Sequence, residues 1–481
     1  MEWDTVIGLE VHAQLKTKSK LFSGAAANFG ANPNSQTCYI DAGFPGTLPV
    51  LNQLAVKMAM QFGLAINADI NNHSYFERKN YFYPDLPKGY QISQFQRPIV
   101  ANGRLKIELS DGSEKDVVID RAHLEEDAGK SLHEAHAQYT GIDLNRAGTP
   151  LLEIVTAPCL FSSEEALSYL KTLHLLVRFL GICDGNMQEG SFRCDVNISL
   201  KPKGSKQLGT RTELKNLNSF RFIEKAIAYE QNRQREVLES GGKIQQETRL
   251  YCPDTNMTQI MRSKENENDY RYFPDPDLLP IQIKPEDLQK IKQEMPILPE
   301  TIKHRLKESG RLNHEDIQFL LSSKASYDFF NELKNASKAD EKTIINWLKG
   351  SFAAALNEAN LGFEKSPLSV SSFAPLLDYL SEQKISGSIA KQIFAKLWAG
   401  EGSVDEIIAK EGYSLDNDES LFENLIHDVI EHHPQQVADY RAGKEKLLAF
   451  FVGQVMKETK GTAHPEQINR LLRKFLNNSV S

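Results

Sequence analysis

The sequence is poor in cysteine. Its 481 residues contain five cysteines, widely scattered and without a C-x-x-C pair. This argues against a disulfide framework or a cysteine zinc site and is typical of reduced thiols in the cytosol. The acidic start Met1-Glu2-Trp3-Asp4 runs directly into a predicted strand, unlike a signal or transit peptide. We therefore expect a cytoplasmic protein.

Long apolar runs and several common catalytic signatures are missing as well. No apolar run in the sequence is long enough to span a bilayer, so we expect no membrane partner. There is no G-x-x-x-x-G-K-[ST], no G-x-G-x-x-G and no G-x-S-x-G. The signatures of P-loop, Rossmann and α/β-hydrolase enzymes are therefore absent.

The net charge of −8 does not by itself indicate a nucleic-acid-binding protein, but the charge is unevenly distributed. Residues 440–481 carry eight Lys and Arg against three acids, a net charge of +5. Residues 401–439 carry eleven acids and one Lys, a net charge of −10. The basic end can contact a phosphate backbone, and a solvated helix face is the alternative.

The predicted secondary structure changes along the chain. Residues 1 to about 290 mix short predicted strands with Gly, Pro and Asn turns, and helical periodicity appears around 51–62, 163–180 and 220–239. This mixture predicts an α+β fold.

A proline-dense connector, Phe273–Pro280, comes before a region with helical periodicity throughout. We predict a mixed-sheet domain at 1–293, an all-α middle domain at 294–405 and an all-α tail domain at 406–481.

The most informative pattern lies in the first predicted strand, Val6–Leu15. Alternate side chains of a strand point to opposite faces. The odd-numbered residues then form an apolar face, while Glu10, His12 and Gln14 share the polar face. A carboxylate beside an imidazole on a rigid strand suits metal binding or proton transfer.

Four further predicted strands, Val117–Asp127, Leu151–Val155, Arg193–Leu200 and Arg211–Lys215, each offer at least one carboxylate. If the five strands share a sheet, its polar face concentrates like charges, which raise one another's pKa or recruit a cation such as Mg²⁺ or Mn²⁺. For any one strand, the alternative is an ordinary half-solvated antiparallel strand. Glu153 fits that alternative least, because a carboxylate among apolar residues is costly unless it is paired or ligated.

Two loops carry residues that suit phosphate or nucleic acid. The Gly-bounded loop 185–193 contains Gly190 and Ser191 and can present backbone N–H groups to phosphate, although a plain turn is the alternative. Residues 78–90 interleave Lys79 and other basic residues with aromatics. Such segments can stack on bases, but core aromatics with a solvated rim explain them equally well.

These motifs together resemble a known family, the B-type subunits of the aspartyl/glutamyl-tRNA amidotransferases. The matching stretches run from residue 6 to residue 461 in the family's order; they are VIGLEVHAQLKTKSKLFS, FPGTLPVLN, RKNYFYPDLPKGYQISQF, HLEEDAGK, NRAGTPLLEIVT, MQEGSFRCDVNISL, RTELKNLNSFRF, DYRYFPDPDLLP and GQVMKETKG.

The resemblance implies a fold and a reaction. In this family the N-terminal "cradle" is similar to the catalytic domain of glutamine synthetase. With ATP as co-substrate and Mg²⁺ (or Mn²⁺), it phosphorylates the side-chain carboxylate of Glu on tRNA(Gln) or Asp on tRNA(Asn). Ammonia released from glutamine by a partner amidase subunit travels through an internal channel and displaces the phosphate. A small third subunit clamps the other two together in a heterotrimer, and the helical regions dock the tRNA.

The resemblance also implies roles for individual residues. It assigns metal binding to His12, Glu125 and Glu153, places Glu10, Glu213, Arg193 and Lys215 among the catalytic candidates, and places Lys79, Asn197, Gly190 and Ser191 among the residues that bind the nucleotide.

One departure from the family pattern is visible. Many members carry C-x-x-C where this chain has Cys38-Tyr39-Ile40-Asp41. Asp41 replaces a soft ligand, which argues against a structural zinc here.

Two other functions stay open at the level of sequence. One is a tRNA-docking scaffold whose acidic face is structural, and the recurring polar faces favour an enzyme over it. The other is a free-standing carboxylate–amine ligase for a small molecule, against which the basic segment 440–481 counts mildly.

Deleting residues 410–481 is expected to weaken tRNA binding, because it removes the basic segment that would contact the phosphate backbone. Assembly with the other subunits should be unaffected. Fluorescence anisotropy with labelled tRNA and the assembled complex measures the effect, and an unchanged affinity would contradict the prediction.

Overall fold

The structure is a computed structural model that describes residues 2–133, 138–263, 267–413, 419–458 and 465–477. The chain divides into two compact units, Met1–Thr301 and Ile302–Ser481. The first unit mixes strands and helices, and the second is helical in its described residues. The α+β prediction is therefore confirmed, whereas the predicted division of the helical part at residue 405 stays a prediction.

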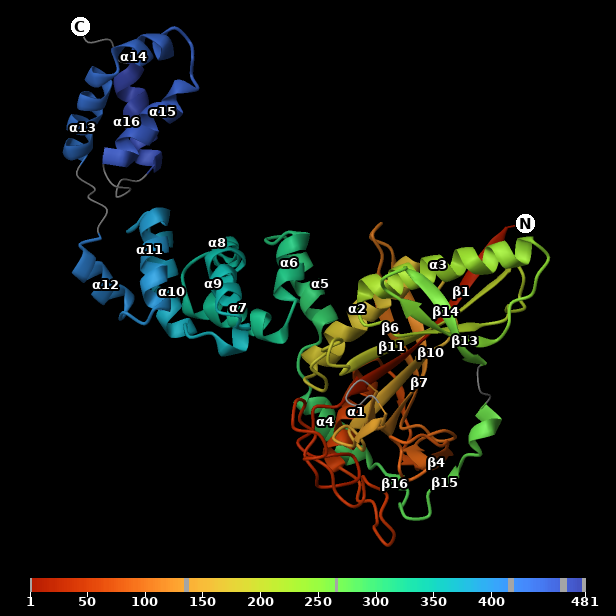
Figure 1. The fold of residues 1–481 in the computed structure, drawn as a ribbon. Coiled ribbons are helices and arrows are strands. Elements are labelled where there is room, and N and C mark those ends of the chain that lie inside the picture. Colours follow the sequence, from red (N-terminus) through yellow and green to blue (C-terminus); the bar gives the residue numbers. More distant parts are fainter. Residues whose placement is uncertain (1, 134–137, 264–266, 414–418, 459–464, 478–481) are drawn as a thin grey trace. The chain divides into compact units, whose positions relative to one another are not determined.

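The first unit is built on a mixed sheet that contains nine strands within the described residues (Figure 1). Neighbouring strands are antiparallel except for β12 and β13, which run parallel. The spatial order is β14 (Met257–Ser263), β13 (Glu247–Cys252), β12 (Thr212–Lys215), β11 (Phe192–Pro202), β1 (Trp3–Gln14), β10 (Pro150–Thr156), β7 (Glu114–Glu126), β6 (Val100–Glu108) and β2 (Asp69–Ile70).

Shorter strands form three small sheets. The first joins β15 (Phe273–Pro274), β4 (Glu77–Asn80) and β5 (Tyr90–Ser93); the second joins β16 (Ile281–Gln282) to β3 (His73–Ser74); the third joins β8 (Lys130–Leu132) to β9 (Gly141–Asp143). The proline-dense segment thus contributes β15, which pairs with β4, and leads into β16, which pairs with β3. It is anchored to the first unit and is not a free connector, because proline is tolerated in short edge strands.

The core of the first unit lies on the apolar face of the large sheet. The odd-numbered residues of β1 from Ile7 to Ala13 are fully buried. They belong to one apolar cluster with residues of α1 (Gln53–Ala65), α2 (Ser163–Phe179) and α3 (Phe220–Glu239). All three helices coincide with segments of predicted helical periodicity. Since they pack on the apolar face, the polar face is left for a site.

Each of these helices starts at a side-chain cap. Asn52, Ser162 and Ser219 accept hydrogen bonds from backbone N–H groups in the first turns of α1, α2 and α3. Such caps satisfy donors that the helix itself leaves unpaired.

The remaining elements are helical. Near the end of the first unit lie the 3₁₀ turn η1 (Glu267–Tyr270), α4 (Pro285–Glu294) and α5 (Pro299–Ser309), which crosses the boundary between the units. The second unit contains α6 (His314–Leu320), α7 (Lys324–Ala336), α8 (Glu341–Trp347), the π-helical turn η2 (Leu348–Phe352), α9 (Ala353–Glu358), the 3₁₀ turn η3 (Phe363–Lys365), α10 (Val370–Ser381), α11 (Gly387–Trp398), α12 (Val404–Glu411), α13 (Glu419–His432), α14 (Pro434–Arg441), α15 (Leu447–Glu458) and α16 (Pro465–Asn477). Helices α13 to α16 share a core cluster that includes Ile426, Phe451 and Leu472. Among the described residues, no helix combines the length and apolarity needed to cross a bilayer.

A buried ion pair holds the loop that follows β1. Lys20 is fully buried, and its Nζ lies 3.1 Å from Asp41 Oδ2. Asp41 also accepts hydrogen bonds from Ser23 Oγ at 2.9 Å and from the Cys38 N–H at 3.0 Å. The Asp41 carboxylate, predicted to replace a cysteine of the family pattern, is therefore held by this chain's own lysine, hydroxyl and backbone groups.

Replacing Lys20 by Met is expected to destabilise the first unit by about 3–5 kcal/mol, because it leaves the Asp41 carboxylate buried without its cation. The double variant Lys20→Met/Asp41→Leu should recover much of this loss. Calorimetric unfolding measures both. The control Lys57→Met breaks the exposed pair with Glu294 and should leave the stability nearly unchanged. Equal losses in the single and double variants would contradict the prediction.

Candidate active site

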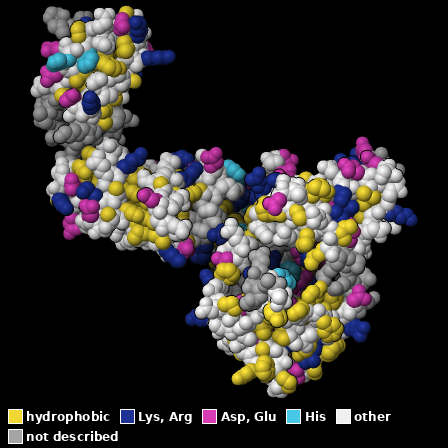
Figure 2. Space-filling model, viewed as in Figure 1, with side chains coloured by type: hydrophobic (Ala, Val, Ile, Leu, Met, Phe, Trp, Pro, Cys, Tyr) yellow, Lys and Arg dark blue, Asp and Glu magenta, His cyan; other side chains and the backbone are white. Residues whose placement is uncertain are grey.

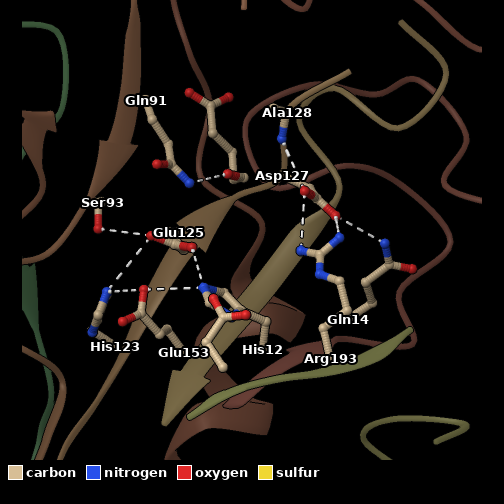
Figure 3. Close-up of polar contacts among 12 residues, drawn as sticks. His12, Gln14, Gln91, Ser93, His123, Glu125, Asp127, Ala128, Glu153 and Arg193 are labelled. Atoms are coloured by element: carbon tan, nitrogen blue, oxygen red, sulfur yellow. Dashed lines mark hydrogen bonds and ion pairs between the residues drawn. The ribbon is translucent and has the colours of Figure 1, made fainter. Parts of the chain in front are cut away.

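The strand register gathers acidic and imidazole side chains on the polar face of the large sheet (Figure 3). Glu153 of β10 lies opposite His12 of β1, and His123 of β7 lies opposite Glu153. Two residues earlier on β1, Glu10 lies opposite Asp195 of β11. Opposed residues of antiparallel strands share a face, with Cβ atoms about 4.5–5.5 Å apart. The five strands predicted to carry carboxylates thus lie in one sheet.

His12, Glu125 and Glu153 form the first cluster. His12 Nε2 lies 3.5 Å from Glu125 Oε1 and 3.3 Å from Glu153 Oε2. One possible ligand atom from each residue lies within 4.8 Å of the other two. Glu125 and Glu153 are only 2% and 9% exposed. Two buried carboxylates at this separation require positive charge, and two oxygen donors with one imidazole nitrogen suit a divalent cation such as Mg²⁺ or Mn²⁺.

His123 belongs to the same cluster, although no role was predicted for it from the sequence. Its Nε2 lies 3.4 Å from Glu153 Oε2 and 3.7 Å from Glu125 Oε2. Its Nδ1 is buried and has no hydrogen-bond partner among the described residues. The signal was present in the sequence, because His123 shares the polar face of its strand with Glu125. Only the register with β10 shows that it reaches Glu153.

The two imidazoles supply the positive charge of this cluster. Burial by itself lowers the pKa of His123, but Glu153 and Glu125 reverse that effect and raise the pKa to about 9. Burial also opposes protonation of His12, whose pKa Glu153 and Glu125 nevertheless raise. Burial raises the pKa of Glu153, yet His123 and His12 hold it well below the usual value. An imidazole must be neutral to ligate a metal, so a cation bound by His12 would replace a proton.

Glu10, Asp195 and Glu213 form a second cluster, whose ligand atoms also lie within 4.8 Å of one another. Lys215 makes an ion pair with Asp195, and its Nζ lies 3.6 Å from Glu213 Oε1. Burial lowers the pKa of Lys215, but Asp195 and Glu213 outweigh it and raise the pKa above its ordinary value. Asn197 Nδ2 donates to Glu10 Oε1 at 2.8 Å. The predicted lysine is therefore charged and paired with carboxylates of the protein.

Both clusters border one cavity of about 780 Å³. In Figure 2, histidine and acidic side chains are visible inside a hollow of the first unit. Lys79 also lines the cavity, and its Nζ lies 4.9 Å from the centroid of the Tyr270 ring. Burial lowers the pKa of Lys79, whereas Glu125 and Glu153 raise it and prevail. The predicted site residues that line the cavity are Glu10, His12, Lys79, Glu153, Asn197, Glu213 and Lys215, and Glu125 contacts His12.

Three predicted site residues, Arg193, Gly190 and Ser191, are not among the described residues that line this cavity. Arg193 Nη1 and Nη2 donate to the two oxygens of Asp127 at 2.9 and 3.2 Å. The Ser191 carbonyl accepts a hydrogen bond from the Gln14 N–H at the end of β1. Arg193 is thus paired with Asp127, Ser191 joins its loop to β1, and a phosphate contact by these residues stays a prediction.

Comparison with known proteins bears on this site. A family model described as the GatB/GatE catalytic domain matches residues 5–289, which is more than half of the chain, and a GatB domain model matches residues 328–476. The chain belongs to the GatB/GatE family. Every residue that lines the cavity falls within the segment matched to the GatB/GatE catalytic domain.

Relatives agree with this membership of the GatB/GatE family. A Legionella pneumophila (strain Lens) protein named as the B-type subunit of an aspartyl/glutamyl-tRNA(Asn/Gln) amidotransferase is 67% identical over 476 residues, covering 99% of this chain and 100% of the relative. A Coxiella burnetii (strain CbuG_Q212) protein of the same name is 55% identical over 477 residues, with the same coverage. The family predicted from the sequence motifs is confirmed.

Glu153→Gln is expected to weaken Mn²⁺ binding by about 100-fold or more, because it removes a ligand charge at the centre of the first cluster. Electron paramagnetic resonance of free Mn²⁺ measures the affinity. The matched control Glu294→Gln changes an exposed carboxylate outside the cavity and should leave the affinity unchanged. Equal Mn²⁺ affinities of Glu153→Gln and the unsubstituted protein would contradict the assignment.

Proposed function

We propose that this chain is the subunit of a tRNA-dependent amidotransferase that activates the side-chain carboxylate of Glu-tRNA(Gln), Asp-tRNA(Asn) or both for conversion to the amide. The observation that carries the proposal is the single cavity bordered by two carboxylate clusters and by Lys79 and Lys215. Transfer of a phosphoryl group from ATP to a carboxylate requires positioning and charge neutralisation more than covalent chemistry by the protein. The cavity offers groups for both.

The donor set fits the cation and nucleotide that such a reaction needs. His12, Glu125 and Glu153 would hold Mg²⁺ or Mn²⁺, since they are close together, largely buried and short of permanent positive charge. Glu10, Asp195 and Glu213 offer a second group of oxygen donors. A bound divalent cation would neutralise the nucleotide phosphates and the reacting carboxylate.

The chain's own residues prepare the cavity for this chemistry. Lys79 and Lys215 keep positive charge at its wall, because neighbouring carboxylates raise the pKa of both and stabilise their protonated forms. Asn197 holds Glu10, and Thr248 Oγ1 donates to Glu213 Oε2 at 2.7 Å. These contacts fix the carboxylates before a ligand binds, which reduces the reorganisation that the reaction would require.

Aromatic side chains border the same cavity. The rings of Phe95 and Tyr272 are stacked with centroids 4.4 Å apart, and both residues line the cavity. An acyl phosphate is readily hydrolysed, so its amidation by ammonia depends on the exclusion of water. The stacked pair supplies an apolar wall suited to that requirement.

The remaining parts of the proposal concern partners. The relatives are named as one subunit of an amidotransferase, which supports a complex with other subunits. In that complex an amidase subunit supplies ammonia from glutamine, a small third subunit joins the amidase to this chain, and the helical second unit docks the tRNA. We also propose that the fold of the first unit is similar to the catalytic domain of glutamine synthetase.

Glu125→Gln and Glu153→Gln are each expected to reduce tRNA-dependent ATP cleavage and amide formation by about 100-fold or more in the assembled complex. Radiolabelled ATP and misacylated tRNA measure the two activities. Glutamine hydrolysis by the partner amidase reports on assembly. Glu114→Gln is the matched control, because Glu114 lies on the same strand as Glu125 but is exposed and pairs with Lys106. Full activity of both cavity variants would favour a docking scaffold instead.

A further inference from the structure

Arg121 is a basic residue of the cavity for which the described residues provide no ionic partner. It lies on β7, two residues before His123 on the same face, and lines the cavity. Its Nε is buried and has no hydrogen-bond partner within the same described set. A buried donor in this state costs stability, so its retention needs a reason.

Three other basic groups of the first unit are engaged, whereas Arg211, which also lines the cavity, is exposed to solvent. Arg193 is held by both oxygens of Asp127, Lys215 is paired with Asp195, and Lys79 lies over the ring of Tyr270. Arg193 and Lys215 each pair with a carboxylate of the protein, and Lys79 makes a cation–π contact. Arg121 differs from these three because no side chain among the described residues pairs with it, which leaves its charge for a ligand.

The strand register explains why the carboxylates of the two clusters do not pair with Arg121. Arg121 lies opposite Val155, and Val155 lies opposite Glu10. The apolar Val155 therefore separates the guanidinium from the second carboxylate cluster by two strand spacings, about 10 Å between backbones. In the first cluster, the Glu153 carboxylate already pairs with His123, whose Nε2 lies 3.4 Å from Glu153 Oε2. Arg121 thus lines the same cavity as both clusters and pairs with none of their carboxylates.

We propose that Arg121 binds a phosphate oxygen of the nucleotide in this cavity, an inference that rests on the proposed function above. A guanidinium presents parallel N–H donors that match the oxygens of a phosphate. During phosphoryl transfer, charge is spread over the equatorial oxygens of the transferred group, where an arginine stabilises it. Five Asp and Glu side chains line the cavity, so an incoming polyphosphate needs a cation that these carboxylates do not already neutralise.

Arg121→Gln and Arg121→Lys in the assembled complex test this. Equilibrium dialysis with a non-hydrolysable ATP analogue and Mg²⁺ should show an affinity about 10–100-fold weaker for Arg121→Gln. The affinity of Arg121→Lys should lie between those of Arg121→Gln and the unsubstituted complex, because lysine keeps the charge but loses the forked donors. The KM for aminoacyl-tRNA should not change, and tRNA-dependent ATP cleavage should fall at least as far as nucleotide affinity.

Two controls separate a binding role from a structural one. The melting temperature of nucleotide-free Arg121→Gln should equal or exceed that of the unsubstituted complex, because an unsatisfied buried donor is removed. Arg104→Gln makes the same change at an exposed residue of the neighbouring strand β6, outside the cavity lining, and should leave nucleotide affinity unchanged.

Several results would overturn the proposal. Unchanged nucleotide affinity in Arg121→Gln, with ATP bound normally by the unsubstituted complex, would refute the role of Arg121 alone. A raised KM for aminoacyl-tRNA with normal nucleotide affinity would show instead that Arg121 recognises the amino-acid carboxylate. Failure of the unsubstituted complex to bind ATP would overturn both this inference and the proposed function.

Discussion

Like charges gathered on one face of a sheet repel one another, and the opposite face must offset that cost. In β1 from Ile7 to Ala13, the odd-numbered apolar side chains are fully buried, and they alternate with Gly8, Glu10 and His12, which line the cavity. The strand is anchored by the helices packed on its apolar face and lies between β10 and β11 in the sheet. A one-residue slip would turn Glu10 and His12 into the core, so the packing that stabilises the fold also sets the register of the site.

The period-two pattern predicts which side chains share a face, but not which strands are neighbours. It therefore placed Glu10, His12, Glu125 and Glu153 on polar faces correctly. Strand order and register depend on contacts distant in sequence. Arg193 shows the consequence, because its strand face was predicted but its partner was not. Both terminal nitrogens of Arg193 donate to Asp127, which is 66 residues away in the sequence. His123 was overlooked for the same reason, because only its register with Glu153 brings it into the first cluster.

Asp41 illustrates a different limit of sequence reasoning. The residue type argues against a cysteine metal site, but nothing local in the sequence indicates what takes the place of a metal. The structure shows that Lys20 reaches it from 21 positions away, in a place where both side chains are buried. A cation provided by a side chain and one provided by a metal ion satisfy the same electrostatic demand, since both prevent a buried carboxylate from remaining unpaired.

The same electrostatic demand accounts for the charge arrangement of the cavity. In the first cluster, protons on His12 and His123 balance Glu125 and Glu153, and a metal ion bound there would replace the proton on His12. In the second cluster, Lys215 balances Asp195 and Glu213 only in part. Arg121 pairs with no carboxylate among the described residues, because Val155 separates it from the second cluster. A group that is unsatisfied in the free protein gains its interaction only when an anionic ligand arrives, so its full contribution goes to binding and not to folding.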